Sequence, residues 1–290
     1  MWGGAAANLI YRACIRDCEF DQMQGWGIYV DEAPRGGVPQ FSVWAIYQNL
    51  EIHDTIAGGG IYIGGNGTTA QSFENCTIKN CGGSAVTSSG GQGLSFLDCT
   101  FESNIGPEMS LMNCLTVAAR SCWFQDALGP GQFFVVADGE HRGLTLDACT
   151  FRQVATAADP GGNDLGAVRI AGYGRAVVVR GCEFLLAHGA LANGAGTGQI
   201  VIDAPSNPSN PSEVLIMDCC ATDVLGPQAP RIQDGSTRTA LVNTAGRIRL
   251  PRLDATAIAG LLNVSAGDMV FNTTLNKAVL FDGTTWQPLW

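Results

Sequence analysis

Acidic residues and a histidine recur at matching places near the start of the chain. Glu19 and Asp21 are followed 32 residues later by Glu51 and His53, and Asp54 comes directly after them. If these residues stack in neighbouring turns of a coil, the like charges of Glu19 and Glu51 raise the pKa of one another. Glycoside hydrolysis requires two carboxyl groups about 5 to 9 Å apart. Glu19 and Glu51 are therefore candidate catalytic residues, and a solvated acidic face is the alternative interpretation.

A second group of ionisable residues lies in the segment Asp138-Gly139-Glu140-His141-Arg142. We expect a loop here, in which carboxylates, an imidazole and a guanidinium could serve as acid, base and clamp. Asp138 and Glu140 are the further catalytic candidates. The alternative is an ordinary hydrated loop.

An outward-pointing tryptophan forms the third candidate site. Trp123 is expected to lie beside Glu102 and Arg152, because it occupies the outward position just before the second apolar column described below, and they occupy the outward position just after that column in the neighbouring copies of the repeat. An exposed indole with polar neighbours suits stacking on a sugar ring, so these three residues are candidate carbohydrate-binding residues. Burial of Trp123 in an interface between copies of the chain is the alternative.

Sequence motifs for cofactors and metals are missing. With three histidines and no paired Cys-x-x-Cys, the chain offers no pattern typical of a zinc site. There is no Walker loop and no Gly-x-Ser-x-Gly elbow, and the Gly194–Gly198 run lacks the flanking strand and helix of a dinucleotide site. We therefore expect neither a cofactor nor a bound metal.

The elements that position these side chains are copies of one repeat, whose clearest example is Leu144–Phe151. Aligned on Cys149, it has seven partners, spaced by 32, 26, 23, 23, 27, 33 and 37 residues along the whole series. A unit this short cannot bury its own apolar face, so its copies must stack on one another. The anchors are Cys18, Leu50, Cys76, Cys99, Cys122, Cys149, Cys182 and Cys219.

Two apolar columns flank a turn in every copy. Alternation with period two predicts strands, and the doubled polar step between them predicts a bend. Such a rung belongs to a parallel β-helix, in which like residues stack about 4.8 Å apart. A further strand is expected 10 to 19 residues after each anchor, as at 27–30, 60–63, 133–136, 167–170 and 199–202. The first column holds Ile15, Tyr47, Phe73, Phe96, Ala119, Leu146, Val179 and Ile216; the second holds Phe20, Ile52, Ile78, Phe101, Phe124, Phe151, Phe184 and Ala221; the turn holds Asp17, Asn49, Asn75, Asp98, Ser121, Ala148, Gly181 and Asp218.

The cysteines fit this pattern better than they fit a disulfide framework. Seven of the eleven occupy the anchor column, where a small apolar side chain turns inward after the bend. Leu50 fills the same place in one copy. We therefore predict free, buried thiols along this column. The four others are Cys14, Cys81, Cys114 and Cys220.

Composition limits the class of protein and its partners. Apolar residues make up 46% of the chain, charged residues only 14%, and glycine accounts for 38 of 290 positions, which suits a turn-rich all-β protein. The formal charge of −10 disfavours nucleic acid and anionic membranes as partners. The first residues have no basic segment typical of a secretory signal, and no apolar run is long enough to span a bilayer, so we expect synthesis in a cytosol and no membrane insertion.

Three regions are predicted. Residues 1–12 form a lead-in that caps the first rung, unless another chain covers that edge. Residues 13–235 form a β-helix of about eight rungs. Residues 236–290 form a small β-rich module with a short helix at 254–259 and a meander of strands at 269–272, 278–281 and 286–289.

Two resemblances to known protein families add to these predictions. Residues 10–235 resemble the right-handed parallel β-helix of the pectate-lyase and phage tailspike group. The segments Gly267–Thr274, Asn276-Lys277 and Phe281–Trp286 resemble the C-terminal module of bacteriophage tail fibres and other virion-attached proteins. The resemblance implies a homotrimeric appendage on the surface of a phage particle, made in the host cytoplasm, that meets a host-surface polysaccharide and is attached through another virion protein.

The chain also departs from these families. An N-terminal virion-binding domain is not visible, and neither is the arginine-rich calcium-site pattern of pectate lyases, so no catalytic residue transfers. A glycan-binding appendage without catalysis is the first hypothesis. A polysaccharide depolymerase, acting as glycoside hydrolase or lyase, is the second, and a structural capsid decoration or baseplate protein is the third.

Overall fold

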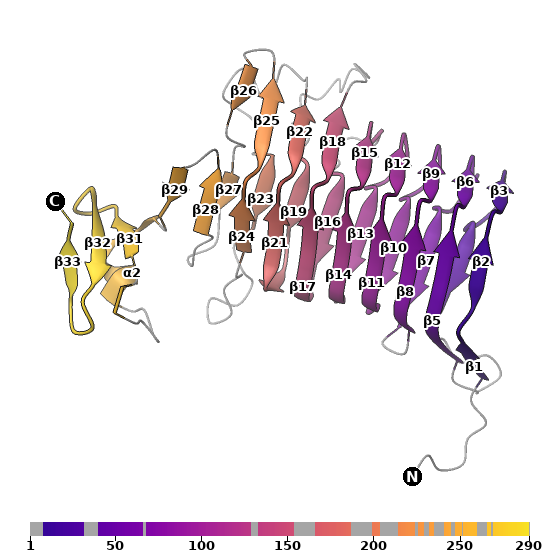
Figure 1. The fold of residues 1–290 in the computed structure, drawn as a ribbon, viewed down its shortest axis with the longest axis horizontal. Coiled ribbons are helices and arrows are strands. Elements are labelled where there is room, and N and C mark those ends of the chain that lie inside the picture. The colour runs from indigo at the N-terminus through magenta and orange to yellow at the C-terminus, as the bar shows by residue number, and fades with distance from the viewer. Residues whose placement is uncertain are drawn as a thin grey trace, which may run out of the picture.

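The computed structural model shows a chain wound into a stack of rungs, with the N-terminal strands at one end and a small separate sheet beyond the other (Figure 1). Three parallel sheets run along the stack, so the predicted all-β parallel β-helix is confirmed. The structure describes residues 8–31, 40–65, 68–128, 133–153, 166–186, 199–203, 214–223, 226–228, 232–234, 241–244, 247–250, 252–259, 266–267 and 269–289.

The first sheet contains the strands that precede each bend. Its pairs are parallel except for the last, β28 with β29. β2 (Cys14–Arg16) also pairs with β5, and β20 (Tyr173–Arg175) with β17. In spatial order its strands are β1 (Asn8–Tyr11), β5 (Gln40–Gln48), β8 (Thr68–Glu74), β11 (Gln92–Leu97), β14 (Leu115–Arg120), β17 (Glu140–Asp147), β21 (Val177–Arg180), β24 (Val214–Met217), β28 (Leu241–Thr244) and β29 (Arg247–Arg249).

The second and third sheets complete each rung. The second contains β3 (Glu19–Asp21), β6 (Glu51–His53), β9 (Thr77–Lys79), β12 (Thr100–Glu102), β15 (Trp123–Gln125), β18 (Thr150–Gln153), β22 (Glu183–Leu186), β25 (Cys220–Asp223) and β26 (Gly226–Gln228). The third contains β4 (Ile28–Val30), β7 (Ile61–Gly64), β10 (Val86–Ser89), β13 (Met109–Met112), β16 (Val135–Asp138), β19 (Val168–Ile170), β23 (Ile200–Ile202) and β27 (Ile232–Asp234). The third-sheet strands are the further strands expected after each anchor.

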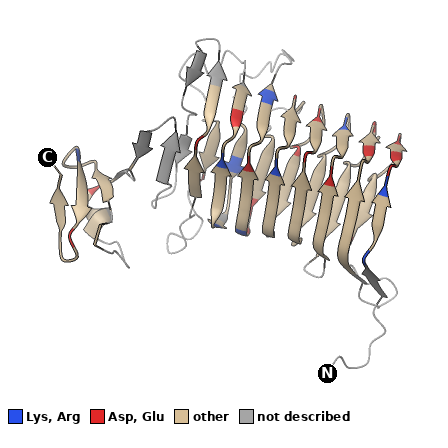
Figure 2. Cartoon of the chain, viewed as in Figure 1, with Lys and Arg blue, Asp and Glu red and all other residues tan. Residues whose placement is uncertain are grey.

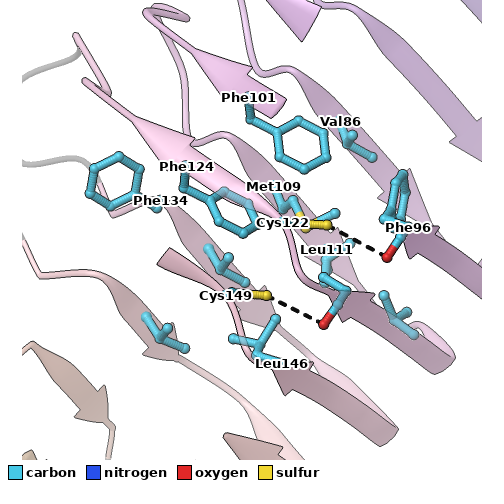
Figure 3. Close-up of a cluster of buried hydrophobic side chains, with 14 of the residues drawn as sticks. Val86, Phe96, Phe101, Met109, Leu111, Cys122, Phe124, Phe134, Leu146 and Cys149 are labelled. Carbon is cyan, nitrogen blue, oxygen red and sulfur yellow. Dashed lines mark hydrogen bonds between the residues drawn. The ribbon is translucent and has the colours of Figure 1, made fainter. Parts of the chain in front are cut away.

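The strand register matches both predicted columns. In the first sheet Phe73 pairs with Tyr47 and with Phe96, and in the second Phe124 pairs with Phe101 and with Phe151. Aromatic rings therefore stack along the core. The Phe124 ring lies 4.9 Å from that of Phe101 (Figure 3), and it lies 4.7 Å from that of Phe151. Repetition of one inward pattern has produced one continuous apolar core.

The predicted turn column adopts a single backbone conformation. Its seven non-glycine residues and Gly181 all have φ between 51° and 60°, the left-handed region. The seven amides from Asp17 to Gly181 each donate to a carbonyl of the next rung, as from Asp98 to Arg120 and from Ala148 to Arg180. Aspartate and asparagine tolerate this conformation, which explains their frequency at the bend.

This column yields a test of the fold. Ala148→Gly should stabilise the protein by about 0.5 to 1 kcal/mol, because relief of the left-handed strain exceeds the extra entropy of glycine in the unfolded chain. Gly181→Ala should destabilise it by a similar amount. A Cβ on Gly181 would meet nothing closer than 3.8 Å, so only the backbone conformation opposes it. Denaturant titration measures both changes, and shifts of the same sign would refute the explanation.

The anchor cysteines have a structural role. Each buried thiol of this column bonds to a carbonyl of the preceding rung, as from Cys122 Sγ to Phe96 O at 3.5 Å and from Cys149 Sγ to Ala119 O at 3.4 Å (Figure 3). All eleven cysteines are free, as predicted. Cys18 was expected to be buried with the others but is exposed, because no earlier rung among the described residues covers the first copy.

The ends of the chain extend and close the stack. β1 and β28 add to the first sheet on either side of the predicted 13–235 range, and residues 1–7 of the predicted cap lie outside the described residues. Beyond them β31 (Met269–Asn272), β32 (Lys277–Phe281) and β33 (Trp286–Pro288) form the predicted antiparallel meander. β30 (Arg252–Leu253) pairs with β31, and α2 (Ala255–Ala259) follows it. Within the described residues no helix is long and apolar enough to cross a bilayer.

Candidate functional site

The acidic residues predicted near the start of the chain do meet on the outer face of the second sheet. Glu19 pairs in register with Glu51, and Asp21 with His53. His53 Nε2 lies 2.9 Å from Glu19 Oε1, and its Nδ1 lies 2.8 Å from Asp54 Oδ2 and 3.3 Å from Asp21 Oδ1. We call Glu19, Asp21, His53 and Asp54 the His53 cluster.

The expected mutual rise in carboxyl pKa does not occur at Glu51. Lys79, one rung further on, donates a hydrogen bond from Nζ to Glu51 Oε1 at 2.6 Å, and this bond and its charge lower the pKa of Glu51. The prediction for this group was wrong, because it left out the cation on β9. An ionised Glu51 has no proton to give a leaving group. Hydrogen bonds to Asp54 and Glu19 raise the pKa of His53.

The predicted tryptophan site is assembled as the repeat implied. The indole Nε1 of Trp123 donates to Gln125 Oε1 at 3.0 Å, and Gln125 Nε2 donates to Glu102 Oε1 at 3.2 Å. The Arg152 guanidinium lies 5.9 Å from the centre of the Trp123 ring. Trp123, Gln125 and Glu102 therefore form one hydrogen-bonded row across β15 and β12, and Arg152 on β18 lies against the Trp123 ring.

The Asp138–Arg142 segment differs from the expected loop. Asp138 ends β16 and Glu140 begins β17, so Gly139 alone connects the two strands. His141 points into the core, where its side chain is buried and its pKa is lowered by that burial. The expected acid, base and clamp therefore do not lie together. His141 is inside the core, and only Asp138, Glu140 and Arg142 of these ionisable residues remain at the surface.

Glu140 and Arg142 of this segment line a groove of about 610 Å³. The groove follows the corner between the third and first sheets across four rungs. Its polar side chains are Ser89, Asn113, Glu140 and Arg142; Leu115 adds an apolar side chain, and Gly65 and Gly90 add backbone. A volume of this order is typical of small-ligand sites.

Backbone geometry holds the groove open and rigid. Gly65, Gly90, Asn113 and Gly139 occupy the corner with φ of 79°, 85°, 53° and 77°. Asn113 Oδ1 accepts a hydrogen bond from the Glu140 amide at 2.9 Å, and a Cβ on Gly139 would lie only 2.3 Å from the same oxygen. Glycine at 139 is thus required both by the turn and by the close approach of Asn113, which positions Glu140.

An ion pair forms the most polar part of this groove. Arg142 Nε donates to Glu140 Oε1 at 2.9 Å, and Nη2 bonds to the same oxygen. Both side chains remain about half exposed. The pair offers a carboxylate acceptor beside guanidinium donors, which suits neighbouring hydroxyl groups of a sugar ring.

Two features were not found by sequence reasoning. Tyr29 and Tyr62 stack at 4.8 Å on the outer face of the third sheet, with the Trp26 ring 5.4 Å from Tyr62. The two tyrosines occupy the same position in the strands at 28–30 and 61–63, and this match is the sequence signal that could have revealed the stack. Glu108 is buried and bonds to Asn104, in a column that otherwise holds small or apolar residues such as Gly60 and Ala85.

Comparison with known proteins agrees with this geometry. A family model described as right handed beta helix region matches residues 3–184. The chain belongs to the right-handed β-helix family. No match was found among curated proteins.

Two solved structures are similar to the chain at low identity. PfbA, a surface adhesin of Streptococcus pneumoniae, is 10% identical, with a TM-score of 0.36 over 97% of this chain and 69% of the adhesin. Tailspike protein 3 of bacteriophage CBA120 is 12% identical, with a TM-score of 0.29 over 95% of this chain and 58% of the tailspike. Likeness at this level carries no argument about fold or function.

Proposed function

We propose that this right-handed β-helix is a non-catalytic, glycan-binding appendage of a bacteriophage virion. The groove at Asn113, Glu140 and Arg142 carries the proposal, because it is a rigid, polar concave surface on the outside of a β-helix. In a β-helix the interior is filled by side chains, so binding must use such outward positions. The Trp123 row and the Tyr29–Tyr62 stack offer further flat surfaces for sugar rings.

The rest of the proposal concerns assembly. The C-terminal segment, whose sequence resembles tail-fibre ends, forms the meander predicted from its strand and turn pattern. On that basis the appendage is a homotrimer on the virion surface, joined to the particle by another virion protein, and its partner is a host-surface polysaccharide.

Catalysis is less well supported than binding. A depolymerase acting by hydrolysis needs an accessible carboxylic acid that keeps its proton. Lys79 keeps Glu51 ionised, and Glu108, whose pKa is raised to about 8, is enclosed in the core. We therefore place binding ahead of depolymerisation.

The groove variants test this proposal. The ligand for the test is a bacterial capsular polysaccharide or lipopolysaccharide that binds the wild type. Arg142→Gln and Glu140→Gln should each weaken this binding by about 10- to 100-fold, the effect of losing hydrogen bonds from a charged group. Surface plasmon resonance with a panel of purified glycans would measure the affinities. Arg180→Gln is the matched control, because Arg180 on β21 forms a similar exposed ion pair with Asp147, at the opposite end of β17 from the groove. Equal loss in the control, or none in the groove variants, would refute the assignment of the groove.

A further inference from the structure

The His53 cluster places three metal-ligand atoms from two rungs close together. Asp21 Oδ1, His53 Nδ1 and Asp54 Oδ2 all lie within 4.8 Å of one another, and the two carboxylate oxygens are 3.3 and 2.8 Å from Nδ1. A cation held tetrahedrally at about 2.1 Å separates its ligand atoms by roughly 3.4 Å. The three donors therefore stand near the spacing that one ion requires.

Glu19 orients the histidine for this role. Its Oε1 lies 2.9 Å from His53 Nε2 and can accept the proton of that nitrogen, while Nδ1, which lies 2.8 Å from Asp54 Oδ2, becomes a ligand atom when an ion replaces the proton between them. A carboxylate that accepts from the far nitrogen of a histidine is the usual outer partner of a metal-binding imidazole.

The local charge balance also calls for a cation. Three carboxylates surround one imidazole, and the nearby Lys79 ammonium is engaged by Glu51 at 2.6 Å. Figure 2 shows acidic residues on β3 and β6 before the basic residue on β9. The His53 side chain is only 14% exposed, so its position is well defined by its surroundings.

We propose that Asp21, His53 and Asp54 bind a divalent cation of the zinc class, with Glu19 as the positioning residue. A mixed nitrogen and oxygen set favours zinc, cobalt or nickel over calcium and magnesium, which prefer oxygen ligands alone. Three protein ligands leave the fourth position to water. The site revises the expectation of no metal, which rested on sequence spacing and did not consider ligands from neighbouring rungs.

The consequence of binding is structural. β3 is the edge strand of the second sheet, and Asp21 lies on it, whereas His53 lies on β6. A shared ion would tie the edge strand to its neighbour and protect the exposed end of the β-helix. A ligand that binds only the folded state raises its thermal midpoint.

Titration of the full chain with Zn²⁺ tests the proposal, with calorimetry for affinity and the thermal midpoint for stabilisation. The wild type should bind one Zn²⁺ and melt at a higher temperature, with little response to Mg²⁺ or Ca²⁺. Glu19→Gln should weaken binding by about 10- to 100-fold, the usual effect of losing an outer carboxylate. Glu51→Gln removes the same charge one rung away without touching His53, so its affinity should stay near that of the wild type.

Three further variants separate this site from other zinc ligands. Asp54→Asn, nearly isosteric and thus safe for folding, should abolish the zinc response, as should His53→Gln. The Cys14→Ser and Cys18→Ser double variant, which removes two exposed thiols, should retain it. The proposal is overturned if Zn²⁺ leaves the wild type unchanged, if Asp54→Asn and His53→Gln still bind, or if the cysteine variant loses binding.

Discussion

Replacing Phe124 with alanine is expected to lower the free energy of unfolding by about 3 to 5 kcal/mol. The ring is fully buried and lies between Phe101 and Phe151 in the aromatic column. Its removal loses apolar contacts, leaves a cavity and interrupts stacking on both sides. Because each rung contacts only its neighbours, the damage should concentrate at the adjoining rungs.

Denaturant titration gives the loss of stability, and hydrogen exchange locates it. Phe124→Leu should cost less than about 1.5 kcal/mol, because it conserves most of the volume. Thr100→Ala, on the outer face of the adjoining strand, should change stability by about 0.5 kcal/mol or less. If Phe124→Ala cost no more than Thr100→Ala, the inward assignment of this column would be wrong.

The second large effect is a fall in stability as pH rises. Burial raises the pKa of Glu108 from 4.5 to about 8. Between these values the unfolded chain has released its proton while the folded chain keeps it, so the unfolded state binds fewer protons. Stability from this group is therefore fully present below pH 4.5 and decreases by about 1.4 kcal/mol per pH unit until pH passes the folded pKa of about 8.

The full change is up to about 5 kcal/mol by this linkage. Glu108→Gln keeps the shape and the bond to Asn104 but cannot ionise, so its stability should be nearly flat over the same pH range. Thermal or denaturant unfolding at pH 5, 6.5 and 8 would measure both proteins. An equal pH dependence in the two would assign the effect to other groups.

The rungs could be predicted from the sequence because their signal is repeated. The columns that contain Phe73, Phe124 and Asp98 each have one local conformation. That conformation requires the same residue types, which therefore return in every copy. The outward orientation of Trp123 and His53 followed from the same register. The lengths of the third-sheet connections vary, so the inward position of His141 could not be derived.

Pairings between rungs were harder to predict than the rungs themselves. The lowered pKa of Glu51 depends on where the flexible Lys79 side chain ends, and the contact of Glu19 with His53 depends on a ring orientation. The groove depends on left-handed turns at Gly90 and Asn113, which the alignment on Cys149 did not include. These features arise from side-chain choices that periodicity does not determine.

The central claim is that the outer surface binds a glycan and leaves it intact. The most direct measurement incubates the full chain with purified bacterial capsular polysaccharides and lipopolysaccharides, then measures retained glycan and new reducing ends in the same samples. Retention of at least one glycan without new reducing ends is the predicted result, with retention reduced in Arg142→Gln. New reducing ends would contradict the claim and identify a depolymerase, and a lack of retention across the panel would contradict glycan binding itself.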